Sequence, residues 1–385
     1  MEPEAKPKAR IAIACGGTGG HLFPGLAIAE EFLNDQCTVT AIISEKEIDQ
    51  QGIGSSDEIQ VISLPSVALT KGGYFKFASG FWKSLLQVRR EFIQFKPDAV
   101  LAMGGFTSAP PIVAGKMAGA KTFLHEANSI PGRANRLLAP YVVKVFTGFP
   151  GTGPLLNCNM ETTCVGMPVR SQFEPGDAGA ARIALGLIAD SPTLLVMGGS
   201  QGASGINKAV LESLPVLCEQ IPSLQFLHLT GKADFEQVRT AYASFPVKSV
   251  VLPFLTEMEL ALAAATVAVS RSGASSLAEF AAMGVPSLLV PYPIAADNHQ
   301  FYNARAYAQS GAALMLEQRE VRPETLLKKI LPLLTDSHIR EQMSRSVSKW
   351  HRADAAAHVV QEILKTLPLS VHCNTATSTL RFGTV

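Results

Sequence analysis

The sequence predicts an α/β protein made of two Rossmann-like domains that face a cleft. Apolar runs of strand length alternate with longer helical patterns through most of the 385 residues, which is typical of parallel, doubly wound sheets. The pattern also starts twice, each time with a strand that ends in a glycine cluster, Gly16–Gly20 in the first half and Gly198–Gly202 in the second. Because the clusters lie about one domain length apart, we expect two domains in tandem.

The first half begins with Arg10–Cys15, a strand that we expect to be buried on both faces because apolar and polar residues do not alternate along it. A helical pattern follows at Pro24–Leu33. The later apolar runs of strand length, separated by segments of helix length, are Val39–Ser44, Ala99–Met103, Lys121–Leu124 and Val142–Phe146.

The second half begins with the strand Thr193–Met197 and the helix Gly205–Leu214. Its further predicted strands are Gln225–Leu229, Val250–Pro253, Val267–Ser270 and Ser287–Pro291.

We place the first domain at residues 9–167 and the second at 168–343. The segment Asn157–Pro175 contains glycine and proline with little periodicity, so we expect a hinge near Gly166–Pro168. A last helix, at about residues 344–365, is expected to pack back on the first domain. The tail, residues 368–385, is Ser/Thr-rich near its start, and we expect it to be disordered.

Composition excludes several classes of protein. Lys plus Arg number 33 and Asp plus Glu number 32, and this balance argues against a general nucleic-acid binder. The six cysteines form no C-x-x-C pair, so we interpret them as free thiols in a reducing cytoplasm. The longest apolar run, Leu260–Val269, is far shorter than the ~20 residues of a membrane span. We therefore expect a soluble protein, or one that touches a membrane without crossing it.

The first glycine cluster predicts a turn that can approach an anion. It reads Gly17-x-Gly19-x-x-Leu22, and the leucine stands where the dinucleotide fingerprint needs a third glycine or an alanine. There is also no G-x-x-x-x-G-K-[ST] sequence, which argues against P-loop ATPase chemistry. A glycine turn at a helix N-terminus remains, with its N–H groups available to an anion. His21 follows and can accept a proton near neutral pH, although a structural role stays open.

Polar residues follow other predicted strands of the first half. Gly104 and Gly105 come after Ala99–Met103, and His125-Glu126-Ala127-Asn128 comes after Lys121–Leu124. The carboxyl ends of strands face the ligand crevice in open α/β sheets. These residues therefore indicate a polar site, with a plain βα turn or a surface loop as the alternative.

The second half contains three elements of a nucleotide-sugar site. Ser272-Gly273 can open a helix whose first N–H groups bind phosphate. Glu279 lies one to two turns further on, where a carboxylate can accept both hydroxyls of a ribose. Asp297-Asn298-His299-Gln300 supplies amides suited to sugar hydroxyls. Each element is weak alone, and it is their order that favours a nucleotide-sugar site.

Taken together, the motifs resemble those of the MurG family, the N-acetylglucosaminyltransferases that complete the lipid-linked disaccharide-peptide precursor of peptidoglycan. The resemblance covers about residues 10–365, and in chain order it rests on Gly16–Pro24, Gly104–Phe106, His125–Asn128, Gly166–Arg170, Gly198–Gly202, Arg271–Ala274 and Asp297–Gln300.

This resemblance implies the B-type glycosyltransferase fold, UDP-N-acetylglucosamine as donor, a polyprenyl-linked muramoylpentapeptide as acceptor, and no cofactor. The residues that match the family's donor-contacting positions are Thr18, Gly19, Gly20, Asn128, Arg170, Ser200, Leu255, Ala274, Ser275, Ser276, Leu277, Ala278, Glu279 and Gln300.

The implied reaction is inverting transfer, in which the muramoyl C4 hydroxyl attacks the anomeric carbon and UDP leaves. We expect His21 to be the base, with Glu126 as its rival. Helix N-termini at Ser200 and Ser272-Gly273, with Arg170, would hold the diphosphate. No D-x-D pair is present, so we expect leaving-group stabilisation without a metal. The alternatives are a diacylglycerol sugar transferase or UDP-sugar epimerase, an NAD-dependent oxidoreductase disfavoured by Leu22, and a non-catalytic sensor.

A lipid acceptor requires contact with a membrane. We expect docking on the anionic, cytoplasmic face of the inner membrane, with no nucleic acid as partner. The helical stripe Phe81, Leu85, Val88 and Phe92 most simply packs on the first sheet. The residues expected to meet the membrane are the apolar Tyr74, Phe75, Phe77, Phe81, Trp82, Leu85 and Leu86, interleaved with Lys71, Lys76, Lys83, Arg89 and Arg90.

Overall fold

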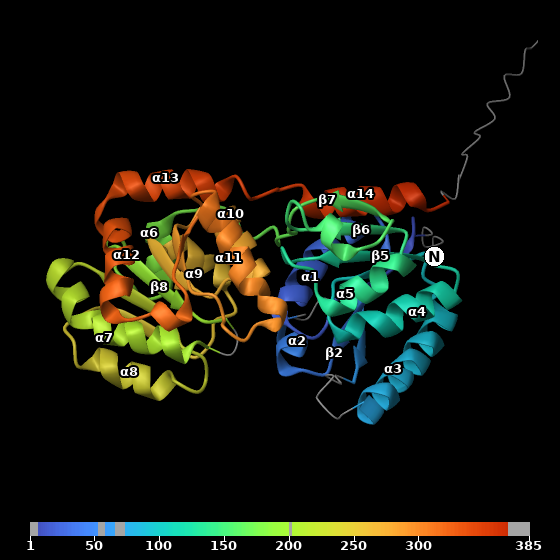
Figure 1. Ribbon diagram of the computed structural model, residues 1–385, viewed down its shortest axis with the longest axis horizontal. Coiled ribbons are helices and arrows are strands. Elements are labelled where there is room, and N and C mark those ends of the chain that lie inside the picture. Colours follow the sequence, from blue (N-terminus) through green and yellow to red (C-terminus); the bar gives the residue numbers. More distant parts are fainter. Residues whose placement is uncertain (1–6, 53–57, 66–73, 200–201, 369–385) are drawn as a thin grey trace, which may run out of the picture.

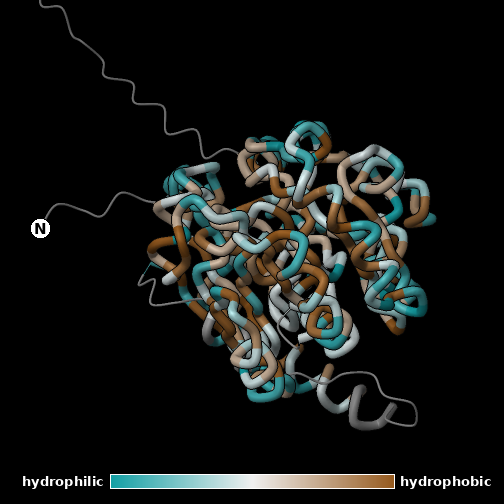
Figure 2. Tube along the Cα trace, turned by 90° about the vertical axis from the view of Figure 1, so that its left-hand side faces the viewer, coloured by the Kyte–Doolittle hydropathy of each residue, from teal (hydrophilic) through white to brown (hydrophobic). Residues whose placement is uncertain are grey.

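The computed structural model describes residues 7–52, 58–65, 74–199 and 202–368. It contains two lobes side by side, each with a parallel sheet between helices (Figure 1). Apolar segments run through the interior of the lobes and hydrophilic segments lie mainly at their periphery (Figure 2). The predicted fold class, two Rossmann-like α/β domains, is confirmed.

The sheet of the first lobe has seven described strands in the order β3-β2-β1-β4-β5-β6-β7, and all pairs are parallel. Their bounds are β1 Arg10–Ala14, β2 Thr38–Ser44, β3 Ile59–Leu64, β4 Ala99–Ala102, β5 Lys121–Glu126, β6 Lys144–Thr147 and β7 Glu161–Cys164. The helices that accompany them are α1 Gly19–Asn34, α2 Glu47–Gly52, α3 Tyr74–Phe95, α4 Ala109–Met117 and α5 Arg133–Leu138.

The sheet of the second lobe has six described strands in the order β10-β9-β8-β11-β12-β13, again all parallel. The strands are β8 Thr193–Met197, β9 Gln225–Leu229, β10 Ser249–Leu252, β11 Val267–Ser270, β12 Ser287–Leu289 and β13 Leu314–Met315. The helices are α6 Ala178–Ala184, α7 Ser204–Gln220, α8 Phe235–Ala243, α9 Met258–Ala264, α10 Ala274–Met283, α11 His299–Gln309, α12 Pro323–Thr335 and α13 Ser337–Ser348.

Helix α1 begins at Gly19, more than a full turn before the predicted start, and Pro24 lies inside it. Proline has no N–H, so it cannot bond the carbonyl oxygen four residues earlier. That oxygen, on Gly20, instead accepts a hydrogen bond from Ser275 Oγ of the second lobe at 3.3 Å. The carbonyl oxygen that Pro24 leaves without its usual donor therefore takes part in a contact between the lobes.

The expected single helix at residues 344–365 is wrong. Helix α13 ends at Ser348 on the second lobe, and α14, Ala355–Thr366, lies on the first lobe beside α1 (Figure 1). The chain between them crosses from lobe to lobe and contacts the expected hinge, where the Arg352 side chain lies 3.1 Å from the place of a Cβ on Gly166. The expectation that the last helix packs back is met by α14, whose Val359 and Ile363 are buried with β1 and α1 residues.

Lys144 on β6 attaches α14 to the first lobe. Its ammonium lies 2.6 Å from carboxylate oxygens of Glu362 on α14 and of Glu161 on β7, and its side chain is 7% exposed. The hydrogen bond from Lys144, together with one from Lys365, lowers the pKa of Glu362 to about 2. This stabilisation is therefore present above the ordinary pKa of a glutamate and is lost as the pH falls towards 2.

We expect Lys144→Ala to lower the free energy of unfolding by about 1–3 kcal/mol, because Glu362 loses a buried, charged partner. Urea denaturation monitored by circular dichroism measures this change. Lys365→Ala removes an exposed partner of the same carboxylate and should cost less than about 0.5 kcal/mol. Equal effects of the two substitutions would contradict the role given to Lys144.

Candidate functional site

A cavity of about 330 Å³ is lined by residues of both lobes. The first lobe contributes the turn after β1 and the first residues of α1, and the second lobe contributes the turns after β8, β10 and β11. In both sheets the central strands, β1 and β4 or β8 and β11, are where the strand order reverses. The carboxyl ends of strands at such reversals are the usual ligand sites of doubly wound sheets.

Many of the predicted donor-binding residues line this cavity. They are Thr18, Gly19, Gly20, Arg170, Leu255, Ala274, Ser275, Ser276 and Glu279. Residues of the two glycine clusters and of the Ser272-Gly273 motif therefore meet in space, although they are far apart in the chain.

Other predicted donor residues lie elsewhere or outside the described part of the chain. Leu277 and Ala278 are buried in the core of the second lobe and do not form part of the described cavity wall, because they lie on the inner side of α10. Asn128 and Gln300 contribute to contacts within and between the lobes rather than to that wall. Ser200 lies outside the described residues.

Two helix N-termini open onto the cavity. Helix α1 has Thr18 as its N-cap residue, helix α10 has Gly273, and both residues line the wall. Because the first N–H groups of a helix lack partners within the helix and carry a positive partial charge, each start favours an anion. Two such starts on one cavity suit a diphosphate.

Arg170 adds a full positive charge to the same wall. Its guanidinium carbon lies 4.5 Å from the centre of the Phe23 ring and 5.2 Å from that of Phe173. Its buried Nε has no hydrogen-bond partner among the described residues. The Arg170 guanidinium thus packs against two aromatic rings and keeps a donor available.

Glu279 is a partly buried carboxyl group on the cavity wall. Burial raises its pKa to about 7, against the lowering effect of Arg170, and the nearby charge of Glu259 raises it further. Hydroxyl donors from a ligand favour the ionised form. The carboxylate that accepts them would therefore be stabilised by the ligand itself.

A second cavity, of about 250 Å³, lies in the first lobe and shares Thr18 with the first. His21 lines it, together with Lys46 and the Gly105–Thr107 turn after β4. Burial lowers the pKa of His21 to about 4, so its imidazole is neutral at pH 7. Nδ1 of this ring is buried and has no partner among the described residues.

Two residues that the sequence analysis did not single out fix the first glycine turn. Asp49 Oδ2 accepts hydrogen bonds from the Gly17 N–H at 2.6 Å and from the Ser44 N–H at 3.0 Å. Lys46 Nζ donates to the Gly17 carbonyl oxygen at 2.7 Å. Gly17 has a φ of +114°, so this turn requires a glycine and is then held at both ends of that residue. No motif in the sequence marked these two side chains.

Glu126 holds together the loop between β5 and α5. Its Oε1 accepts from the Asn128 N–H at 2.8 Å, and its Oε2 accepts from the Gly132 N–H and from Asn135 Nδ2, both at 2.8 Å. The side chain is 2% exposed. Both carboxylate oxygens therefore already accept hydrogen bonds within the loop. This favours a structural role for Glu126 over the role of a base.

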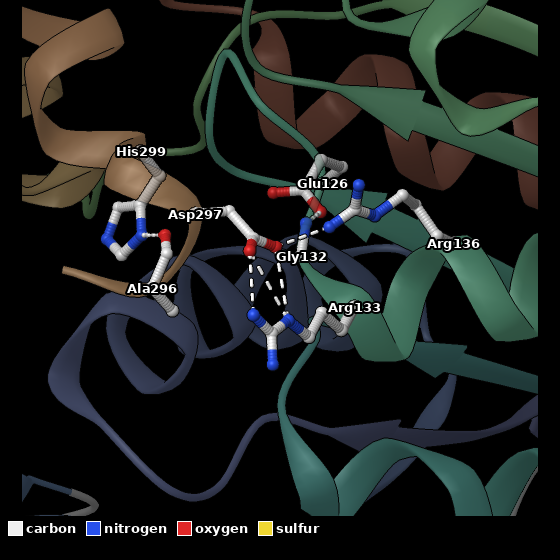
Figure 3. Close-up of polar contacts among 7 residues, drawn as sticks. All are labelled: Glu126, Gly132, Arg133, Arg136, Ala296, Asp297 and His299. Atoms are coloured by element: carbon white, nitrogen blue, oxygen red, sulfur yellow. Dashed lines mark hydrogen bonds and ion pairs between the residues drawn. The ribbon is translucent and has the colours of Figure 1, made fainter.

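The lobes also meet through polar side chains that the motifs did not predict. Asn303 on α11 is fully buried. It accepts from Ser129 N and Oγ, both at 2.9 Å, and donates to Asn128 Oδ1 at 3.0 Å. Asp297 forms ion pairs with Arg133 and Arg136 of α5 (Figure 3). Their partners lie more than a hundred residues away in the chain, so local sequence patterns contain no signal for them.

Comparison with known proteins relates both lobes to one family. Residues 11–147 match the glycosyltransferase family 28 N-terminal domain, and residues 193–359 match the family 28 C-terminal domain. Two relatives, from Pelobacter propionicus and Geotalea daltonii, are each 35% identical over 92% of this chain, which covers 99% and 97% of them. Both are named UDP-N-acetylglucosamine--N-acetylmuramyl-(pentapeptide) pyrophosphoryl-undecaprenol N-acetylglucosamine transferase.

Solved structures agree with this relationship. The crystal structure of Acinetobacter baumannii MurG has a TM-score of 0.70 and 27% identity, and the match covers 93% of this chain and all of that one. A UDP-N-acetylglucosamine 2-epimerase described as putative, from Listeria monocytogenes, also has a TM-score of 0.70 but only 14% identity, so it supports the fold alone. From the two matched domains and the relatives of nearly equal length, the chain belongs to the MurG family of N-acetylglucosamine transferases, within glycosyltransferase family 28.

Proposed function

We propose that this transferase moves N-acetylglucosamine from UDP-N-acetylglucosamine to the C4 hydroxyl of the muramoyl residue of undecaprenyl-diphospho-muramoylpentapeptide. The observation that carries the proposal is the pair of cavities that meet at Thr18. One has two helix N-termini, Arg170 and Glu279 for a nucleoside diphosphate, and the other has a neutral imidazole.

In the donor cavity, the starts of α1 and α10 and the guanidinium of Arg170 hold the diphosphate, and Glu279 accepts the ribose hydroxyls. As the bond between the anomeric carbon and the phosphate oxygen breaks, negative charge grows on the diphosphate. Fixed N–H dipoles and one cation stabilise that charge without having to reorganise. The described residues contain no cluster of three His, Cys, Asp or Glu side chains suited to a metal.

In the second cavity, His21 accepts the proton of the C4 hydroxyl while the hydroxyl oxygen attacks the anomeric carbon. A base must be unprotonated before it reacts, and the low pKa of His21 keeps it so at neutral pH. Attack from the side opposite to UDP inverts the anomeric centre and gives a β-1,4 bond. Of the two candidate bases we favour His21, because Glu126 is occupied by the loop that it holds.

The test is the release of UDP, measured with a coupled assay, from UDP-N-acetylglucosamine in the presence and absence of the lipid acceptor. The proposal requires release that depends on the acceptor, together with a disaccharide product. Binding of the UDP-sugar without such release would indicate a sensor. Binding of NAD in its place would indicate an oxidoreductase. Release without any acceptor would indicate a hydrolase or an epimerase-like enzyme.

We further propose that α3 docks the protein on the anionic, cytoplasmic face of the inner membrane, where wall precursors for cell shape and division are made. Leu85, Val88 and Phe92 of this helix are buried against the sheet, as the apolar stripe predicted. Leu85 therefore belongs to the core and not to the docking surface. The described residues contain no helix long and apolar enough to cross a bilayer.

The outer side of α3 supports this proposal. Trp82, Leu86 and Ile93 are 60%, 54% and 65% exposed, and at helical spacing they form one stripe. Lys83, Arg89 and Arg90 are exposed beside it. Aromatic and aliphatic side chains can enter the bilayer interface while cations meet anionic lipid. Of the other residues predicted to dock, Lys71 and the side chains of Tyr74, Phe75, Lys76 and Phe77 lie outside the described part.

We expect the double substitution Trp82→Ser and Leu86→Ser to weaken binding to vesicles of phosphatidylglycerol and phosphatidylcholine at least about tenfold, because two apolar groups can no longer be buried. Vesicle co-sedimentation measures this binding, and UDP affinity should not change. Ile183→Ser with Ile188→Ser is the matched control, since those residues are 64% and 53% exposed on the second lobe. Full vesicle binding by the α3 variant would rule out this helix as the docking surface.

A further inference from the structure

The turn between β12 and α11 has an unusual backbone. Asp297 and Asn298 follow one another with φ values of +50° and +55°. For residues other than glycine this left-handed region is costly, and aspartate and asparagine tolerate it best. Such conformations persist where the surroundings hold them in place. Contacts from the other lobe hold the Asp297 side chain here.

Those contacts come from two arginines on one side of α5. Arg133 Nη2 lies 2.9 Å and its Nε 3.3 Å from Asp297 Oδ1, and Arg136 donates to Oδ2 (Figure 3). The arginines are three residues apart, so they are neighbours on the helix surface. Asp297 thus receives two cations from the first lobe while it lies on the second.

Both ends of this contact are attached to fixed parts of the site. On the first lobe, the buried carboxylate of Glu126 holds Gly132 and Asn135 on either side of Arg133. On the second lobe, three residues after Asp297, the Gln300 carbonyl oxygen accepts from Ser272 Oγ at 2.7 Å. Ser272 precedes Gly273, the N-cap of α10 on the donor cavity. The contact therefore connects the β5–α5 loop to the helix start that faces the diphosphate.

We infer that Asp297 is a positioning residue that holds the two lobes at the separation at which their walls form one donor site. The site needs both lobes, because Thr18 and Gly20 come from the first and Ala274 and Glu279 from the second. The inference rests on the proposed function only for the identity of the donor. Asp297 thereby differs in role from its motif neighbours, because its carboxylate contacts the arginines of the other lobe and not a sugar.

Asn303 provides a second, buried bridge. It contacts Asn128 and Ser129 of the first lobe, and it donates to the Ser272 carbonyl oxygen at 3.3 Å. Loss of Asp297 therefore leaves this bridge intact, together with the contact of Ser275 with Gly20. The lobes then stay associated but sample wider separations, and the effect on the donor site is moderate and sensitive to salt.

The test substitution is Asp297→Asn, because asparagine tolerates the left-handed backbone and removes only the charge. We expect the Kd for UDP to rise about 3- to 10-fold in dilute buffer, the range that one or two partly exposed ion pairs contribute. Salt screens such pairs, so the difference from the unchanged protein should shrink as KCl is raised. The donor KM should rise while kcat changes less than about twofold, and the melting temperature should hardly move.

The arginines complete a double-mutant cycle. If the ion pairs act as inferred, Arg133→Gln with Arg136→Gln has the same effect as Asp297→Asn, and all three substitutions together have no greater effect. Additive effects would overturn the inference, because the arginines and the aspartate would then act separately. Glu236→Gln, which removes an exposed ion pair with Arg239 on α8, is the matched control and should leave the Kd unchanged.

Small-angle scattering of the protein without ligand gives a readout that is independent of UDP. Asp297→Asn should increase the radius of gyration, and an unchanged value together with an unchanged Kd would overturn the inference. The two proposals can fail separately. A shifted Kd with no transfer to the lipid acceptor would preserve the role of Asp297 and reject the transferase reaction.

Discussion

Replacing His21 with alanine is expected to lower turnover about 10²- to 10⁴-fold while the Kd for UDP stays close to that of the unchanged protein. The size is that of losing a general base. Donor binding should survive because His21 lines the second cavity and is not among the described residues of the donor cavity wall. Steady-state kinetics with saturating acceptor, together with calorimetric UDP titrations, separate the two effects.

The pH dependence of turnover provides an independent check. Burial lowers the pKa of His21 to about 4, with Asp49 acting to raise it and with His299 and Lys46 acting to lower it. Such a base is unprotonated from pH 6 to 8, so kcat should be flat there and fall only at more acid pH. A collapse of UDP affinity in His21→Ala would show that the histidine binds or supports the donor site. A loss of turnover in Glu126→Gln with a normally folded loop would make Glu126 the base.

Glu279→Ala is expected to weaken UDP binding by about 1–3 kcal/mol, roughly 5- to 150-fold, because the charge-assisted hydrogen bonds to the ribose hydroxyls are lost. Isothermal titration with UDP and with 2′-deoxy-UDP measures the change. Compared with UDP, 2′-deoxy-UDP should bind the unchanged protein more weakly. For the variant, the difference between the two ligands should be much smaller. Equal affinity of both proteins for both ligands would remove Glu279 from the site.

The raised pKa of Glu279 also predicts the direction in which the affinity for UDP-N-acetylglucosamine changes with pH. Its value of about 7 means that the carboxyl group is ionised above neutral pH and protonated below it. The ionised form accepts both hydroxyls, so affinity for UDP-N-acetylglucosamine should increase from pH 6 to 8, and Glu279→Gln should remove that dependence. Glu259→Gln is the control. Because Glu259 raises the pKa of Glu279, its loss should shift the rise in affinity to lower pH.

The central strands could be predicted from sequence because they are buried on both faces, and Thr193–Met197, Gln225–Leu229 and Val267–Ser270 match the structure residue for residue. Of the four described edge strands, β10 is predicted to within one residue, at Val250–Pro253, but β3, β7 and β13 are not predicted. Strand β7 is polar and half exposed, and it lies in the segment expected to be an irregular hinge. Strand β13 is two residues long. An edge strand buries little, so its sequence need not be apolar.

The functional site likewise contains residues that could be predicted from the sequence and residues that could not. Glycine turns, Arg170 and Glu279 could be found because each motif is local. The Lys46 and Asp49 clamp on Gly17, the Asn303 bridge and the ion pairs of Asp297 depend on partners distant in the chain. Along α3, only the helical phase separates the buried Leu85 from the exposed Leu86. Tertiary packing decides the roles of Lys46, Asp49, Asn303 and Asp297, and local sequence patterns contain no signal for them.

Pro24 has a consequence for how this transferase can evolve. Because Pro24 has no N–H, the Gly20 carbonyl lacks its usual donor within α1, and it accepts a hydrogen bond from Ser275 of the second lobe. A residue with an N–H at position 24 would give α1 its missing bond and compete with the neighbouring lobe for the same oxygen. A substitution of Pro24 that stabilises α1 would therefore weaken the contact between the first lobe and the second. Selection for contact between the lobes can in this way retain a proline that selection for the stability of α1 alone would remove.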